Sequence, residues 1–389
     1  MIPGLWDMHV HAWSRQPFEG IYLAHGITGI REMGTGMDPQ WGGEGIWRWR
    51  ESIRTGDAPG PRMVAAGLIL NGGAADAQPI DFFKGVPTAD AARAWVDSLA
   101  GRGVDFIKVY AALSPEVYAA IGARAREHGL PFAGHVPALV GIRGASDAGQ
   151  RSIEHLYDVL VAASTDEAAA RAEIAAALRG GGSPGGAAQI AEIGMTDRLL
   201  ATFDAGKADA LYRLLARNGT WVTPTLATQA DPRCPGSPLP VPDSAALAGV
   251  PRMLHRFVAL AEQPADEIAR DCRRMEALIR VAGAMHRAGI PLLAGSDGPN
   301  PGVVPGIALH QELELLVRAG LTPMEALQTA TRNPARYLGM EDSLGTIQPG
   351  RLADLVLLDA DPLADIRNTR RIHAVIANGR VVHPSETRH

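Results

Sequence analysis

Short apolar runs alternate along this chain with longer stretches whose apolar residues recur at helical spacing. Amphipathic stretches such as Pro115–His128 and Ala265–Ala288 separate some of these runs, and the glycine that follows each can end a helix. Strands that alternate with helices favour a parallel sheet. The predicted strands are, in chain order, Leu5–Ala12, Thr28–Met33, Arg62–Gly67, Asp105–Ala111, Pro131–Val136, Ser152–Leu156, Thr220–Leu226 and Pro291–Ser296.

Eight strands with intervening helices predict an α/β fold of the TIM type, a closed (β/α)8 barrel. An open, doubly wound sheet is the alternative, and it would normally carry a glycine-rich phosphate-binding turn after its first strand. No such turn follows Leu5–Ala12. The length of 389 residues suits a barrel with a small appendage.

The last fifty residues have a different pattern, so we expect a barrel over residues 1–340 and a β appendage over residues 341–389. Ala353–Asp359 and His373–Ala377 have the composition of strands. Asn378 and Gly379 form a hairpin signal before a further short strand.

Two connections between predicted strands are long. Val159–Asn218 contains the glycine tract Gly180–Gly186, and Gln229–Ala265 contains several prolines. Segments of this kind in compact domains are usually lids or binding loops. A disordered insertion is the alternative for the glycine tract.

The charge balance is mild, with 37 basic and 42 acidic side chains and a net charge of −5. We therefore expect a small-molecule substrate and neither nucleic acid nor an anionic membrane as partner. Cys234 and Cys272 are too few for a disulfide framework and fit a reducing compartment. The expectation is a cytoplasmic protein; a signal peptide upstream of Met1 and a homo-oligomeric state stay open.

The first candidate for chemistry is the pair His9 and His11 in the phrase Asp7-Met8-His9-Val10-His11. Residues at positions i and i+2 of a strand point to the same face, so both imidazoles can ligate one ion. Histidines that are only hydrogen-bonded in a core are the alternative.

Lys108 lies within the apolar strand Asp105–Ala111, where burial of a charged amine is costly. A neutral amine can react with carbon dioxide to form a carbamate, an anionic group that can bridge two metal ions. A buried salt bridge to a carboxylate such as Glu154 is the main alternative.

His135, His155 and Asp297 end three further predicted strands. Each alone has a structural alternative, since an aspartate at a strand end is often a helix cap. Together with the two histidines of the first strand and Lys108, they place metal-ligand types at the ends of strands one, four, five, six and eight. These ends converge on the catalytic face of a barrel, which predicts a metal centre there.

This series resembles the binuclear amidohydrolase superfamily, and more narrowly its imidazolonepropionase-like and prolidase-like (Xaa-Pro dipeptidase) members. The phrases that carry the resemblance are PGLWDMHVH, DFIKVY, AGHVP, SIEHL, AGSD and the ending GTIQPGRLADLVLLD with VIANGRVV.

The resemblance implies two divalent metal ions. His9, His11 and Asp297 would hold the buried ion, His135 and His155 would hold the exposed ion, and carboxylated Lys108 would bridge them. Imidazole and carboxylate ligands suit Zn²⁺, although manganese, iron or cobalt can occupy such sites.

The implied activity is amide hydrolysis of a dipeptide or N-acyl amino acid by a hydroxide that bridges the ions, with Asp297 moving the proton. A cyclic amide, lactone or phosphoester substrate is an alternative at the same site. A catalytically inactive barrel that binds a small molecule is the alternative from another class.

The chain departs from the family pattern at its N-terminus. Members usually carry several strands before the HxH strand, and these strands form a β-sandwich with the C-terminal strands. Here Pro3 and Gly4 already lead into the first barrel strand, so either the chain is truncated or mis-started, or the β-sandwich appendage is reduced. If the partner strands are missing, we expect strand Ala353–Leu358 to have an unpaired edge.

Four further residues are candidates for contacts with the substrate. Tyr110 and Tyr157 follow Lys108 and His155 by two positions each, and we expect their hydroxyls to assist catalysis by donating to the substrate carbonyl; packing at the barrel rim is the alternative. Arg31 and Thr225 are predicted to bind substrate, Arg31 through a substrate carboxylate; an ion pair of Arg31 with Glu32 or Glu154 is its alternative.

Overall fold

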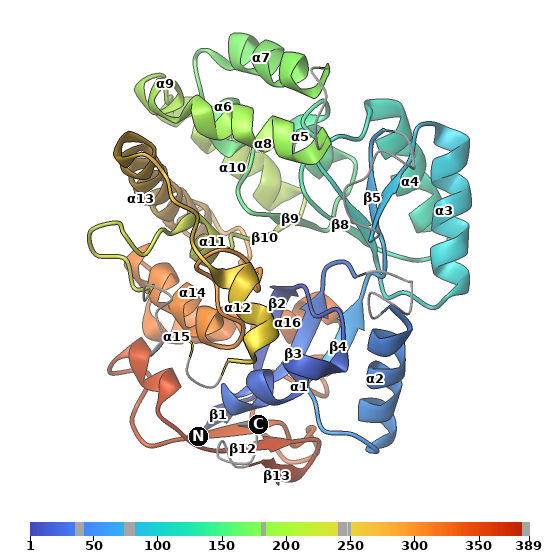
Figure 1. The fold of residues 1–389 in the computed structure, drawn as a ribbon, viewed down its shortest axis with the longest axis vertical. Helices are drawn as coiled ribbons and strands as arrows, with labels where there is room; N and C mark the ends of the chain where they lie inside the picture. Colours follow the sequence, from blue (N-terminus) through green and yellow to red (C-terminus); the bar gives the residue numbers. More distant parts are fainter. Residues whose placement is uncertain (36–42, 74–81, 180–183, 240–246, 248–249, 383–389) are drawn as a thin grey trace.

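The computed structural model describes residues 1–35, 43–73, 82–179, 184–239, 247 and 250–382. Parallel strands form a barrel, and helices lie around its outside (Figure 1). The predicted (β/α)8 barrel is confirmed. The barrel strands are β2 (Leu5–Val10), β3 (Ile27–Glu32), β4 (Arg62–Ala65), β5 (Ile69–Asn71), β7 (Ile107–Val109), β8 (Phe132–Gly134), β9 (Ser152–Glu154) and β10 (Trp221–Thr223), with β6 (Phe83–Gly85) paired beside β5.

The segment 291–298 lies between β10 and β2, takes the position of the eighth barrel strand and closes the barrel. It makes isolated bridges rather than a full strand: Leu293 N–H donates to Val222 O at 2.9 Å on one side. On the other side Met8 N–H donates to Ala294 O at 2.9 Å. At the other junction Asp105 N–H donates to Ala65 O at 3.0 Å, which joins the β2–β3–β4 sheet to the remaining strands.

The third predicted strand is longer than expected and is bent. The sequence prediction ended at Gly67, whose φ of 73° turns the chain. The chain then continues as β5, so β4 pairs with β3 while β5 pairs with β7. β5 and β6 were not predicted from the sequence.

Helices follow most of the strands. They are α1 (Arg15–Ala24), α2 (Gly43–Thr55), α3 (Ala89–Gly101), α4 (Pro115–Glu127), α5 (Gly141–Asp147), α6 (Val159–Ala162), α7 (Glu167–Arg179), α8 (Pro184–Gly194), α9 (Thr196–Ala201), α10 (Ala205–Arg217), α11 (Leu226–Gln229), α12 (Arg252–Val258), α13 (Ala265–Arg287), α14 (Ile307–Arg318), α15 (Pro323–Thr329) and α16 (Arg332–Leu338). The two predicted amphipathic helices correspond to α4 and α13. In α4 the Ser114 side chain caps the N-terminus, and Pro115 occupies the first turn.

The C-terminal residues form a small antiparallel sheet with strand order β1-β11-β12-β13. Its strands are β1 (Ile2–Pro3), β11 (Leu355–Leu358), β12 (Ile372–Ala377) and β13 (Arg380–Val382), with the 3-10 helix η3 (Ile366–Arg370) between β11 and β12. The expected unpaired edge at Ala353–Leu358 is wrong, because Ile2 pairs with Val356 and β11 therefore lies between β1 and β12. The boundary at residues 340/341 falls between α16 and β11 and stays a prediction.

The first long connection contains helices α6 to α10. The second begins at the last residue of α11 and contains α12. Residues 180–183 of the glycine tract lie outside the described residues. Cys234 is joined to Cys272 by a disulfide, a pairing that was not expected from the sequence. This bond attaches the segment after α11 to α13. No helix among the described residues is both long and apolar enough to span a membrane.

Candidate metal centre

The predicted ligands meet at the carboxyl ends of the barrel strands. His11, Lys108, His135, His155 and Asp297 all line one cavity of about 880 Å³. His9 lies beneath them with no exposed surface. A second cavity of about 1090 Å³ lies between α16 and the appendage, and none of the predicted site residues line it.

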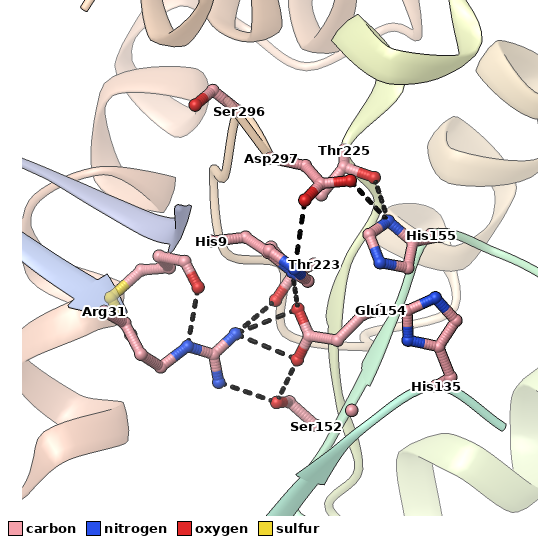
Figure 2. Close-up of polar contacts among 12 residues, drawn as sticks. His9, Arg31, His135, Ser152, Glu154, His155, Thr223, Thr225, Ser296 and Asp297 are labelled. Carbon is pink, nitrogen blue, oxygen red and sulfur yellow. Dashed lines mark hydrogen bonds and ion pairs between the residues drawn. The ribbon is translucent and has the colours of Figure 1, made fainter. Parts of the chain in front are cut away.

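Asp297 is the centre of this cluster. Its Oδ1 lies 3.2 Å from His11 Nε2. The same Oδ1 lies 3.4 Å from His9 Nε2, and Oδ2 lies 3.7 Å from His155 Nδ1 (Figure 2). His9, His155 and Asp297 each offer one ligand atom, and these atoms lie within 4.8 Å of one another. That spacing suits a metal ion bound between them.

Three buried atoms of the site have no hydrogen-bond partner among the described residues. They are His9 Nε2, His135 Nδ1 and Lys108 Nζ. Buried polar atoms are rarely left without a partner, so these three atoms are available to bind a further group. Two imidazole nitrogens and an amine within one carboxylate-containing cavity fit a metal cation and, at Lys108, a carbamate.

The charge states of the side chains also favour cation binding. Burial lowers the pKa of His9 and His135 well below the ordinary histidine value, and burial lowers the pKa of His155 to about 4. The imidazoles are therefore neutral, which is the state that ligates metals. Burial also lowers the pKa of Lys108 to about 8, which increases the neutral amine that carbamate formation needs.

A side-chain acceptor and a backbone acceptor orient two of the histidines. His9 Nδ1 lies 2.9 Å from Glu154 Oε2, and His11 Nδ1 lies 3.0 Å from the Gly34 carbonyl oxygen. These contacts hold the proton on Nδ1 and turn Nε2 toward Asp297. Such outer contacts are typical of metal-ligating histidines.

Comparison with known proteins agrees with this geometry. The amidohydrolase family model matches residues 1–382. The chain belongs to the amidohydrolase family. This is a family of hydrolases, and the resemblance stated from the sequence is confirmed.

Curated relatives match this amidohydrolase over short segments. An imidazolonepropionase of Aeromonas hydrophila is 33% identical over 107 residues, which are 27% of this chain and 25% of that protein. Adenine deaminase 2 of Rhizobium meliloti is 55% identical over 74 residues, which are 19% of this chain and 11% of that protein. The matched part thus spans a quarter or less of these relatives' length.

Solved structures match over nearly the whole chain. A Xaa-Pro dipeptidase with bound methionine has a TM-score of 0.63 at 21% identity, covering 98% of this chain and 86% of that one. Bottromycin amidohydrolase has a TM-score of 0.68 at 24% identity, covering 99% and 77%. At these identities the likeness shows the fold.

In this amidohydrolase Arg31 lies outside the cavity lining, which does not fit the contact with substrate predicted from the sequence. Its side chain is 1% exposed and lies below the metal ligands. Arg31 Nη2 donates to both carboxylate oxygens of Glu154 at 2.9 Å, and its Nε donates to Met8 O at 2.6 Å (Figure 2). Its Nη1 donates to Ser152 and Tyr337, so no nitrogen of the guanidinium faces the cavity.

The same contacts disfavour the predicted alternative for Lys108, a buried salt bridge to Glu154. Glu154 is occupied by Arg31 and His9, and the amine of Lys108 has no hydrogen bond to it. Arg31 therefore fixes Glu154, and Glu154 fixes the metal ligand His9.

We expect Arg31→Met to lower the free energy of unfolding by about 3–5 kcal/mol, because Glu154 would be left as a buried, unpaired carboxylate. Chemical denaturation followed by circular dichroism measures this change. Arg54→Met is the matched control, since the Arg54–Glu51 pair is exposed and should contribute much less. Equal losses in the two variants would contradict the role given to Arg31.

Thr225 is also placed differently from the prediction. It is fully buried, and its Oγ1 lies 2.7 Å from His155 Nδ1. It does not line the cavity, so it orients His155 rather than binding substrate.

The backbone is bent at several strand ends of the site. Among the described non-glycine residues, positive φ values occur at His155, Leu156, Asp158, Thr225, Asp297 and Asn378. All but Asn378 lie at or just beyond the carboxyl ends of barrel strands. Such conformations are costly for L-residues and cluster at functional sites. The bend at His155 lets it face the cavity although Glu154, its neighbour, contacts the same cluster.

A glycine allows a close contact between strands at the site. A Cβ added at Gly295 would lie 2.8 Å from His9 Cβ and 2.6 Å from Thr223 Cγ2. Glycine at this position therefore lets segment 291–298 approach β2 and β10 closely enough to bring Asp297 to the histidines.

Tyr110 and Tyr157 both line the cavity, as predicted. The ring of Tyr110 lies 4.0 Å from that of His135, and the ring of Tyr157 lies 5.9 Å from it in a stacked arrangement. Gln189 lies near the Tyr110 hydroxyl and Gln229 near the Tyr157 hydroxyl, and all four residues line the cavity. Burial raises the pKa of both phenols, so both hydroxyls are protonated and able to donate.

Sequence reasoning missed the residues that act behind the ligands and above them. Glu154 was considered only as an ion-pair partner of Lys108 or Arg31 and not as the residue that orients His9, although its position beside His155 in the phrase SIEHL was a usable signal. The residues at the mouth of the cavity, among them Trp13, Phe82 and Phe257, lie far apart in the sequence and have no motif.

Proposed function

We propose that this chain is a metal-dependent hydrolase that cleaves the amide bond of a dipeptide or N-acyl amino acid. The observation that carries the proposal is the set of buried, unpartnered ligand atoms of His9, His135 and Lys108 beside the Asp297 carboxylate. Burying polar atoms without partners costs free energy of folding, and a bound cation would offset that cost.

We assign two divalent ions to the site, most simply Zn²⁺. His9, His11 and Asp297 would hold one ion, His135 and His155 would hold the other, and a carboxylated Lys108 would serve both. Bound there, the ions supply a water of lowered pKa and polarise the substrate carbonyl.

The chain's own residues complete the reaction. Burial alone would raise the pKa of Asp297, but nearby His155 and His11 hold it below the ordinary value. Asp297 is therefore ionised and can accept the proton of the attacking water, then deliver it to the leaving amine. The protonated Tyr110 and Tyr157 hydroxyls can donate to the developing oxyanion.

The substrate class rests on the chemistry of similar proteins. An imidazolonepropionase is among the curated relatives, and a Xaa-Pro dipeptidase, an enzyme that cleaves a peptide bond, is among the proteins of similar fold. The cavity of about 880 Å³ has room for a dipeptide. A cyclic amide is the second candidate, favoured by the imidazolonepropionase match.

A substrate panel on the zinc-loaded protein tests the proposal. It contains dipeptides, N-acetyl amino acids, a cyclic amide, a lactone and a phosphoester, and product formation is followed by mass spectrometry. We expect linear amides to be cleaved with the highest kcat/KM. Turnover confined to the lactone or the phosphoester would contradict the proposed amide class.

A further inference from the structure

Arg256 lies at the mouth of the cavity. It belongs to α12 and is exposed, and it lines the cavity together with its neighbours Met253 and Phe257. Lys108 is the other lysine or arginine among the lining residues, and it lies buried at the floor with the metal ligands.

The charge of Arg256 is not neutralised by any described carboxylate. Other arginines near the cavity are paired: Arg274 Nη2 lies 2.8 Å from Glu192, and Arg171 Nη1 lies 2.9 Å from Asp158. Within the described part of the chain Arg256 has neither an ion pair nor a hydrogen bond, and its Cζ lies 4.7 Å from the Phe257 ring centroid. An uncompensated cation at a cavity mouth attracts anions.

The walls around Arg256 are aromatic. The rings of Trp13 and Phe257 lie 4.9 Å apart on one side, and Phe82 and Phe83 lie 5.1 Å apart on another. Phe257 keeps 36% of its surface exposed, so apolar area is free to be covered by a ligand. Covering it contributes about 25 cal/mol for each square ångström.

We propose that Arg256 binds the carboxylate of the amide substrate, whose aromatic or large aliphatic side chain packs against Trp13, Phe82 and Phe257. This inference rests on the proposed function and narrows it to amides that carry a free carboxylate and a bulky apolar group. Arg31, the residue expected from the sequence for that role, is buried and fully engaged with Glu154 and its neighbours. Arg256 takes the role because its guanidinium is accessible from the cavity.

The test compares glycyl-L-phenylalanine with its C-terminal amide in wild type and Arg256→Gln. For the dipeptide, kcat/KM should fall about 10- to 100-fold in the variant, mainly through KM, because a charge-assisted hydrogen bond is lost. For the dipeptide amide, the two proteins should agree within about twofold, since no carboxylate is present. Arg252→Gln, on the same helix and outside the cavity, is the matched control and should behave as wild type.

An equal loss on both substrates, or no loss on either, would overturn the assignment of Arg256. If wild type cleaves neither compound, the proposed function is in doubt, and calorimetric binding of N-acetyl-L-phenylalanine and its amide decides the inference separately. Tighter binding of the carboxylate by wild type that is lost in Arg256→Gln supports it. Equal binding of both ligands by the two proteins contradicts it.

Discussion

The variant Asp297→Asn should lower kcat about 100- to 10,000-fold, the usual contribution of a general acid–base group. Asparagine keeps the shape of the side chain but cannot accept a proton from the attacking water. Asp297 contacts His9, His11 and His155 from one carboxylate, so it is the group best placed to receive that proton. Steady-state kinetics on the best substrate of the panel measures the effect.

Two further measurements separate lost chemistry from lost structure. The thermal midpoint of Asp297→Asn should stay near that of wild type, and substrate binding measured by calorimetry should persist. Asp342→Asn, an exposed aspartate of the turn after α16, is the matched control and should keep full turnover. Undiminished turnover in Asp297→Asn would remove Asp297 from the proton-transfer role.

The variant Lys108→Met should lose most activity and bind fewer metal ions than wild type. Methionine fills a similar volume in a site that has no exposed surface, so we expect the barrel to fold. It cannot form a carbamate, and the shared anionic ligand is then absent. Elemental mass spectrometry gives the metal content, and the expected value is about half that of wild type.

Lys207→Met serves as the control for lysine removal, since Lys207 pairs with Glu167 outside the cavity. Reconstitution of metal-free wild type should also be faster with added bicarbonate, whereas Lys108→Met should not respond. A Lys108→Met variant with wild-type metal content and turnover would show that Lys108 is not a metal bridge.

The fold and the metal ligands could be predicted because each depends on local pattern. Strand-to-helix alternation identifies the barrel, and the rule that strand ends share one face brings together side chains as distant as His9 and Asp297. HxH on a strand and a lysine within an apolar strand are unusual enough to stand out in a single sequence.

The remaining parts of the site depend on three-dimensional contacts that carry no local signal. Arg31 was assigned to substrate because an arginine at a strand end can face the cavity, but its partner Glu154 lies on β9, far along the chain, and draws it into the barrel. Thr225 faces His155 because its φ is 47°, a backbone state that the sequence does not announce. Arg256 and the aromatic residues at the cavity mouth come from several connections between strands and helices, where neither period nor motif marks position.

The most direct test of the metal-centre assignment is the metal content of the purified protein, measured by elemental mass spectrometry without chelators and without a metal-binding tag. We expect about two divalent ions per chain after incubation of the protein with zinc and bicarbonate. A value near one would contradict the bridged centre and the role of Lys108. A value near zero under the same conditions would contradict the metal-dependent mechanism itself.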